Sequence, residues 1–194
     1  MEQSVRNFLR QLEESGRLHD QAEPQHSRRY LNLEPDTAEA LALLLKIAKV
    51  RRLLEIGTSN GYSTIWIAST LASCGGRVTS IEKTPQKHAQ ARENLSRTGL
   101  LSFADLLIGD ATEIVSSLEG PFDCVFFDAD RISAPQQLDL LLPKLSSPAL
   151  LLADNALSHP AEIADYLARI ERLDRTSHSV LKIGKGLSVA YREA

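Results

Sequence analysis

Two apolar runs of this sequence end abruptly in side chains that carry oxygen atoms. The first run is followed by Asp128 and Asp130, and the second by Asp154 and Asn155. A carboxylate at the end of a buried strand is costly unless it is paired, solvated or bound to a metal. If the runs are neighbouring strands, Asp128, Asp154 and Asn155 converge, and their oxygens suit a hard divalent cation such as Mg²⁺. The alternative is that these side chains only begin the loops after their strands.

A glycine-containing turn follows an earlier apolar run, in the segment LLEIGTSNGYSTIWIA. Gly57 and Gly61 let a ligand approach the backbone, and N–H groups at the start of the following helix accept anionic groups. The Gly-x-x-x-Gly spacing differs from the Gly-x-Gly-x-x-Gly pattern of dinucleotide sites, which argues against NAD. Glu55, just before the turn, suits a ligand with ammonium and sulfonium charges better than a pyrophosphate.

Another acid, Glu82, ends the next apolar run, about 20 residues after the turn. A carboxylate in this place can accept both hydroxyls of an adenosine ribose. A solvated strand end is the alternative, and the glycine turn in its expected position favours the ribose.

Alternating strand and helix patterns must position these side chains. Strands are expected at 53–56, 78–81, 106–108, 122–127 and 149–153, and helices at 63–73, 85–99, 110–118, 134–145 and 160–173. Two further strand-like runs, 179–183 and 187–191, flank a Gly-Lys-Gly turn and indicate a hairpin. The alternation predicts a Rossmann-like α/β fold, with a doubly wound, mostly parallel sheet of seven strands and an antiparallel C-terminal hairpin strand.

We expect a single domain, residues 1–194. Residues 1–30 are predicted to form an amphipathic helix ending near Gly16 and then a polar loop or lid, and residues 31–194 the core. Asp36 is the expected N-cap of the first core helix, with Glu39 three residues later.

The composition indicates a cytoplasmic protein that acts on small molecules. A formal net charge of -3 gives no electrostatic footprint for nucleic acid. The two cysteines have no metal-ligand spacing and are expected to be reduced thiols. The N-terminal segment has no signal-peptide core, and no stretch approaches the roughly 20 apolar residues of a membrane span.

The sequence resembles a known family, the class I S-adenosylmethionine-dependent O-methyltransferases. The resemblance is to the metal-dependent catechol and caffeoyl-CoA type, including small bacterial members, and spans roughly Leu31 to Tyr191. The segments that carry it are EIGTSNGYS at 55–63, IE at 81–82, GDA at 109–111, DAD at 128–130 and ADN at 153–155. Each follows or ends a predicted strand, and their order along the chain makes the resemblance specific.

The resemblance implies S-adenosylmethionine as cofactor, with its methionine part in the glycine turn, its ribose on Glu82 and its adenine beside Asp110. The implied cofactor-binding residues are Glu55, Gly57, Ser59, Gly61, Tyr62, Ser63, Glu82, Asp110, Ala111 and Asp128. The family's metal ligands align with Asp128, Asp154 and Asn155. Asp110 can also cap the helix that follows it.

The implied reaction is methylation of a hydroxyl on a small, catechol-like acceptor. A phenol has a pKa of about 10, and chelation by a divalent cation favours its oxyanion. The family carries a lysine, proposed as general base, three residues after the aspartate aligned with Asp128, and this chain has Arg131 there. Arginine cannot accept a proton, so we expect Asp128 and Arg131 to act as catalytic residues with Arg131 stabilising the oxyanion. His159 is a candidate base, and its alternative role is in a helix N-cap region.

Other functions stay open. The acceptor could be a hydroxylated nucleoside in tRNA, which the net charge disfavours without excluding it. The chain could instead be a non-catalytic cofactor-binding module. The presence of all three oxygen-bearing side chains, Asp128, Asp154 and Asn155, argues against this alternative. The resemblance further implies a homodimer, and the sequence does not identify the acceptor.

Overall fold

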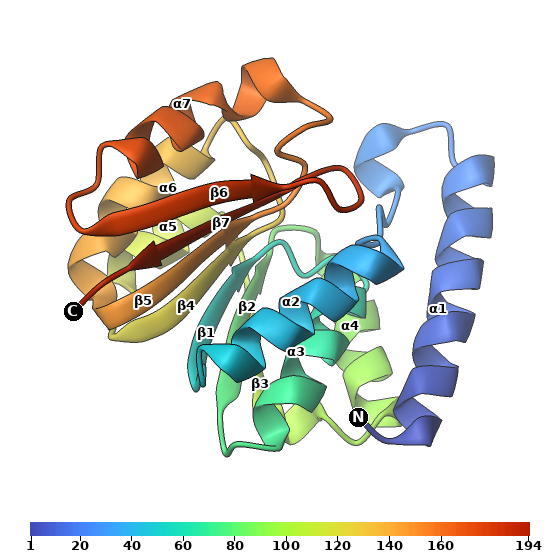
Figure 1. The fold of residues 1–194 in the computed structure, drawn as a ribbon. Coiled ribbons are helices and arrows are strands. Elements are labelled where there is room, and N and C mark those ends of the chain that lie inside the picture. The colour runs from blue at the N-terminus through green and yellow to red at the C-terminus, as the bar shows by residue number, and fades with distance from the viewer.

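The computed structural model describes residues 1–194 and is built on one seven-stranded sheet (Figure 1). The strands are β1 (Arg52–Ile56), β2 (Arg77–Glu82), β3 (Ala104–Ile108), β4 (Phe122–Phe127), β5 (Leu145–Ala153), β6 (Thr176–Leu181) and β7 (Leu187–Arg192). Their order is β3-β2-β1-β4-β5-β7-β6, and only β7 runs antiparallel to its neighbours. The predicted fold class, including the antiparallel hairpin strand, is confirmed.

Helices cover both faces of the sheet (Figure 1). On one face lie α1 (Gln3–Ala22), α2 (Pro35–Ile47), α3 (Tyr62–Ala72) and α4 (Pro85–Arg97), and on the other α5 (Ala111–Ser117), α6 (Ala134–Leu141) and α7 (Pro160–Glu171). Short 3₁₀ turns occur at His26–Arg28, Leu101–Phe103 and Leu142–Lys144. Successive strand residues, such as Leu53 and Leu54 or Leu151 and Leu152, enter opposite clusters because side chains alternate along a strand. Two core layers therefore hold the sheet between them.

The register of the central strands brings the ends of β1, β4 and β5 level. Ile56 pairs with Phe127, and Phe127 pairs with Ala153. The ladder continues one residue further, because the Asp128 N–H donates to the Ile56 carbonyl at 2.9 Å and the Asp154 N–H donates to the Phe127 carbonyl at 3.0 Å. A slip of one residue would turn every core side chain to the other face, so this register is strongly specified. Asp128 and Asp154 consequently follow adjacent strand ends.

The N-terminal helix is longer than predicted. The expected end near Gly16 is wrong, since α1 continues to Ala22. Gly16 is buried at a point where a Cβ atom would lie 2.5 Å from Nδ2 of Asn32. This glycine therefore serves the packing of the chain against the helix, although glycine costs about 1 kcal/mol relative to alanine in a helix.

The first core helix begins two residues before its predicted start. Its N-cap residue is Glu34, and Pro35 occupies the first helical position, where proline is favoured because its missing N–H is not needed. The prediction of Asp36 as N-cap is wrong, and Asp36 lies in the first turn near the positive end of the helix dipole. No helix of the protein combines the length and apolar character that crossing a membrane requires.

Two leucines on α1 provide a test of how this helix packs. Leu9 is 2% exposed in the core, whereas Leu18 is 53% exposed. Leu9→Ala should lower the free energy of unfolding by about 2–5 kcal/mol, because it removes buried methyl groups and leaves a cavity. Leu18→Ala should change it by less than about 0.5 kcal/mol. Urea unfolding followed by circular dichroism measures both, and equal effects would contradict the packing described.

Candidate active site

The acids that follow β4 and β5 face a common region at the carboxyl end of the sheet. Asp154 is 4% exposed and Asp128 is half-buried. Burial raises the pKa of Asp128 well above its ordinary value, and the charge of Asp154 raises it further. Burial also raises the pKa of Asp154, to about 6. At these two strand ends, the cost of burying the carboxylates outweighs the effect of the nearby cations on their pKa values.

One oxygen of this pair has no partner in the protein. The Asp154 Oδ1 atom is buried and accepts no hydrogen bond. A buried carboxylate oxygen without a donor is costly, and a cation or a hydrogen-bond donor from outside the chain would stabilise it. The other predicted oxygen ligand, Asn155, follows directly in a left-handed conformation at φ +63°, and its Oδ1 atom accepts a hydrogen bond from Ser158 at 3.3 Å.

No group of three or more His, Cys, Asp or Glu side chains in the protein forms a metal-binding cluster. The predicted set differs from such a cluster in composition, because it combines the two carboxylates of Asp128 and Asp154 with the amide of Asn155. Oxygen donors of this kind fit Mg²⁺, which keeps several waters and takes only one or two carboxylates from a protein. The predicted metal site stays a prediction.

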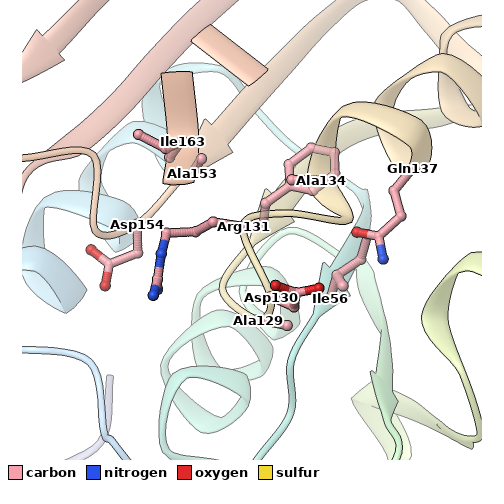
Figure 2. Close-up of a pocket in the computed structure, with 10 residues that line it drawn as sticks. Ile56, Ala129, Asp130, Arg131, Ala134, Gln137, Ala153, Asp154 and Ile163 are labelled. Atoms are coloured by element: carbon pink, nitrogen blue, oxygen red, sulfur yellow. The ribbon is translucent and has the colours of Figure 1, made fainter. Parts of the chain in front are cut away.

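Asp130, the second acid of the Asp-Ala-Asp segment, forms hydrogen bonds within its own loop. The Asp130 carboxylate accepts a hydrogen bond from the Ile132 N–H at 3.1 Å and from the Ser133 hydroxyl at 2.6 Å. In the view of Figure 2, Asp130 and Asp154 lie on opposite sides of Arg131. Asp130 therefore fixes the loop that enters α6.

Arg131 is held by an acid of α7. Its Nε and Nη2 atoms donate to Oε2 of Glu162 at 2.9 and 2.7 Å. The guanidinium still lies near enough to Asp154 to lower the pKa of that carboxyl, against the larger effect of burial. Figure 2 shows the Arg131 and Asp154 side chains next to each other at the edge of a small pocket. The oxyanion-stabilising role expected for Arg131 stays a prediction.

The glycine turn after β1 approaches the backbone of β4 closely. Gly57 has φ +109°, and a Cβ atom there would collide with the Asp128 carbonyl oxygen. Gly61 has φ +87° and is the N-cap residue of α3, with the Cα atom of Ala91 3.1 Å from the position of a Cβ atom. Both glycines are thus required by the protein itself: Gly57 lets the turn pass next to Asp128, and Gly61 lets the start of α3 approach α4.

Glu55 lies behind this turn and is completely buried. Its carboxylate accepts hydrogen bonds from the hydroxyls of Ser63 at 2.6 Å, Thr64 at 2.5 Å and Ser80 at 2.5 Å. Burial raises the pKa of Glu55, and these hydroxyls oppose the rise. The structure therefore brings Glu55 and Ser63 together as partners of each other, joining β1, α3 and β2 beneath the turn.

Glu82 and Ser59 form the outer side of the turn. The Glu82 carboxylate accepts the Ser59 N–H and the Thr84 N–H, each at 2.8 Å. The Ser59 hydroxyl donates at 2.7 Å to the carbonyl of Tyr30, in the segment 23–34 that connects α1 to α2. We call this segment the strap. It passes over the turn, where Lys87 of α4 also holds it through the carbonyl of Arg29 at 2.5 Å.

The remaining predicted cofactor-binding residues, Tyr62, Asp110 and Ala111, lie at the starts of two helices. The Tyr62 side chain is buried in the core, and its backbone lies at the start of α3. Asp110 is the N-cap of α5 and accepts the N–H groups of Thr112 and Glu113 at 2.8 and 3.1 Å, as its alternative role requires. Ala111 begins the same helix.

The sequence did not reveal two charged residues near the acids. Lys185, in the turn of the β6–β7 hairpin, pairs with Glu34 at 2.8 Å, and both affect the pKa values of Asp128 and Asp154. The Gly-Lys-Gly segment gave only a turn signal, and Glu34 stands outside the motifs. Their proximity depends on how the hairpin and the strap fold over the sheet.

The strand order, the glycine turn after β1 and the acids after β2, β4 and β5 form the arrangement of Rossmann-like methyltransferases. The chain belongs to the O-methyltransferase family, whose sequence model matches residues 6–192. This confirms the family identified from the sequence motifs.

Named relatives support the same grouping. The chain is 36% identical over 132 residues to a catechol O-methyltransferase of Niastella koreensis, a match that covers 66% of this chain and 59% of that protein. It is 39% identical over 119 residues to a catechol O-methyltransferase of Mycobacterium tuberculosis, covering 60% of this chain and 53% of that protein. The matches thus span less than two thirds of the length of these relatives. An O-methyltransferase from Bacillus cereus, solved in complex with SAH, is 25% identical with a TM-score of 0.80 and covers 96% of this chain and 91% of its own.

The close approach at Gly57 can be tested against a glycine that has free space. Gly57→Ala should lower the free energy of unfolding by more than about 3 kcal/mol, because a side chain there is strained at positive φ and collides with backbone. Gly75 has φ +71° but nothing within 4 Å of a Cβ atom, so Gly75→Ala should cost about 1–2 kcal/mol. Chemical denaturation compares the two, and a larger loss at Gly75 would refute this explanation.

Asp154 should destabilise the metal-free protein at neutral pH. Its folded pKa of about 6 exceeds its ordinary value of 3.8, so ionisation opposes folding, and stability falls as pH rises between these values. In EDTA at pH 7, Asp154→Asn should therefore raise the free energy of unfolding by up to about 3 kcal/mol, and have little effect near pH 4.

The matched control for this prediction is Asp130→Asn, at an exposed acid whose hydrogen bonds lower its pKa. This change should leave the stability at pH 7 unaltered or slightly lower. Thermal unfolding at both pH values measures the effects, and a loss of stability in Asp154→Asn at pH 7 would contradict the assigned electrostatics.

Proposed function

We propose that this protein transfers the methyl group of S-adenosylmethionine to a hydroxyl oxygen of a small, catechol-like acceptor, with the help of a divalent cation. The observation that carries the proposal is the pair of acids at the ends of β4 and β5, which have raised pKa values and one buried oxygen without a partner. This pair lies next to the glycine turn at which we propose that the cofactor binds.

The cofactor is proposed to bind along the outer surface of the turn, from Gly57 to the start of α3. In this proposal Glu82 takes the ribose hydroxyls, and Asp110, at the next strand end, lies beside the adenine. The Bacillus cereus relative was solved with SAH, the product that S-adenosylmethionine leaves after methyl transfer, which supports this assignment. The other proposed contacts are those of Ser59, Gly61, Tyr62, Ser63, Ala111 and Asp128, while Glu55 holds the turn from behind.

Asp128, Asp154 and Asn155 are proposed to hold the cation, with Mg²⁺ as the ion that suits two carboxylates and an amide oxygen. When bound, such an ion would supply positive charge that favours the ionised form of the acceptor hydroxyl. The residues of the chain would then orient the acceptor in line with the cofactor's sulfonium methyl group. Arg131, fixed by Glu162, would stabilise the oxyanion as a permanent cation.

Two exposed apolar side chains support an aromatic acceptor. Ile132 follows β4 and is 72% exposed, and Leu157 follows β5 and is 50% exposed. Both stand within four residues of a proposed cation ligand, Asp128 or Asn155. An aromatic ring with two neighbouring oxygens could chelate the ion while its carbon face contacts these side chains. The catechol O-methyltransferase names of the relatives agree with this acceptor class.

The homodimer implied by the resemblance is part of the proposal. Leu43 and Ile47 lie one turn apart on α2 and are 59% and 69% exposed, which supports an apolar surface there. Light scattering coupled to size exclusion tests this part separately.

The function is tested by calorimetric titration and an activity assay. S-adenosylmethionine should bind with and without Mg²⁺, and catechol should become its monomethyl ether only in the presence of the ion. Asp154→Ala should lower turnover at least about 100-fold through loss of the ion, whereas Asp130→Ala, whose acid serves only the loop, should keep activity within a few-fold. Full turnover in EDTA would exclude the cation-assisted reaction.

A further inference from the structure

The turn of the β6–β7 hairpin brings a lysine to the proposed acceptor site. The Lys185 carbonyl accepts the N–H groups of Leu157 at 2.9 Å and Ser158 at 3.1 Å, and the Gly186 carbonyl accepts that of Ala156 at 2.9 Å. These three hydrogen bonds join the hairpin turn to the segment that directly follows Asp154 and Asn155. The backbone of Lys185 is therefore fixed relative to the proposed cation ligands.

Glycine is required for this attachment. Gly186 has φ +94°, and a Cβ atom there would lie 2.5 Å from Cγ of Leu157. A larger residue would push the hairpin away from the loop after β5. The hairpin turn thus serves to position the lysine as well as to reverse the chain.

The Lys185 ammonium faces acids from three parts of the chain. Its Nζ atom lies 2.8 Å from Oε1 of Glu34, at the end of the strap. Burial lowers the pKa of Lys185, but Glu34, Asp154 and Asp128 raise it more, so the side chain is a cation at neutral pH. An ammonium has three N–H donors, Glu34 accepts one, and the side chain is 44% exposed. Donors therefore remain for a ligand atom at the site.

Arg131 is the other cation beside the acids, and an acid of α7 holds it in place. Arg131, which stands where the resembled family has a lysine, directs two of its N–H groups to a single oxygen of Glu162. The nearest other lysine of the hairpin, Lys182, is exposed and forms no ion pair. The hairpin therefore supplies a lysine to this site in addition to Arg131 of the loop after β4.

We propose that Lys185 is a catalytic residue of the acceptor site. Its ammonium donates a hydrogen bond to the acceptor oxygen that receives the methyl group, and stabilises that oxygen as an oxyanion. Glu34 is a positioning residue, which holds the ammonium from the side of the strap. This inference rests on the proposed function and adds a residue that the motifs of the family do not contain.

Methyl transfer in this proposal does not require a lysine that accepts a proton. The acceptor hydroxyl releases its proton to water, and the resulting oxyanion forms a bond to the methyl carbon of the cofactor. The carbon–sulfur bond breaks, and sulfur keeps the electron pair and becomes a neutral thioether. Lys185 keeps its proton throughout and supplies charge and a hydrogen bond only.

The test compares Lys185→Met with Lys182→Met, a change of the same kind in the same hairpin. Catechol turnover should fall about 100-fold in Lys185→Met and less than about twofold in Lys182→Met. Bound 4-nitrocatechol, titrated by its absorbance with Mg²⁺ and S-adenosylhomocysteine present, should show an apparent pKa about one unit or more higher in Lys185→Met. Lys185→Arg keeps the positive charge and should restore most of this difference.

Mg²⁺ affinity separates a catalytic role from a structural one. Removal of a cation next to the two acids should leave Mg²⁺ binding by Lys185→Met unchanged or tighter in calorimetry, although its turnover falls. Loss of Mg²⁺ binding together with turnover would overturn the inference, because it indicates a disrupted site. Normal turnover and an unshifted 4-nitrocatechol titration would also overturn it and leave the proposed function intact. A wild-type protein that methylates no catechol would instead remove the proposed function itself.

Discussion

Two backbone hydrogen bonds beyond the last paired residues of β4 and β5 determine the geometry of the site. The Asp128 N–H bonds to Ile56 and the Asp154 N–H bonds to Phe127, so both acids follow the ladder directly. The sheet is buried on both faces, and its register cannot slip without exposing the core. The hydrophobic core thus holds two carboxyl groups at adjacent strand ends, against the cost of burying their ionised forms.

This arrangement costs stability and gives the site its chemistry. Burial and the neighbouring acids raise the pKa values of Asp128 and Asp154, which means that their ionised forms oppose folding. A bound cation would remove that cost, so ion binding and folding are coupled in the proposed enzyme. The turn at Gly57 is subject to a related constraint, because its backbone must pass next to the backbone of Asp128.

Sequence patterns predicted the sheet because its strands and helices have the right periodicity and are separated by glycine and proline. They also predicted which acids follow strands, but not what each acid contacts. Glu55 is the clearest case, since its three hydroxyl partners come from α3 and β2 and cannot be inferred from its position before the turn. Gly16 had the signal of a helix end, and only the side chain of Asn32 explains its presence inside α1. Lys185 depends on tertiary contacts of the hairpin in the same way.

The central claim is that Asp128, Asp154 and Asn155 share one divalent cation beside the cofactor. Crystals grown with S-adenosylhomocysteine and Mn²⁺, which replaces Mg²⁺ and scatters anomalously, test it most directly. The account predicts one strong anomalous peak within about 2.0–2.3 Å of an oxygen of each of the three side chains. A peak elsewhere, or bound cofactor product with no ion at the ends of β4 and β5, would contradict it.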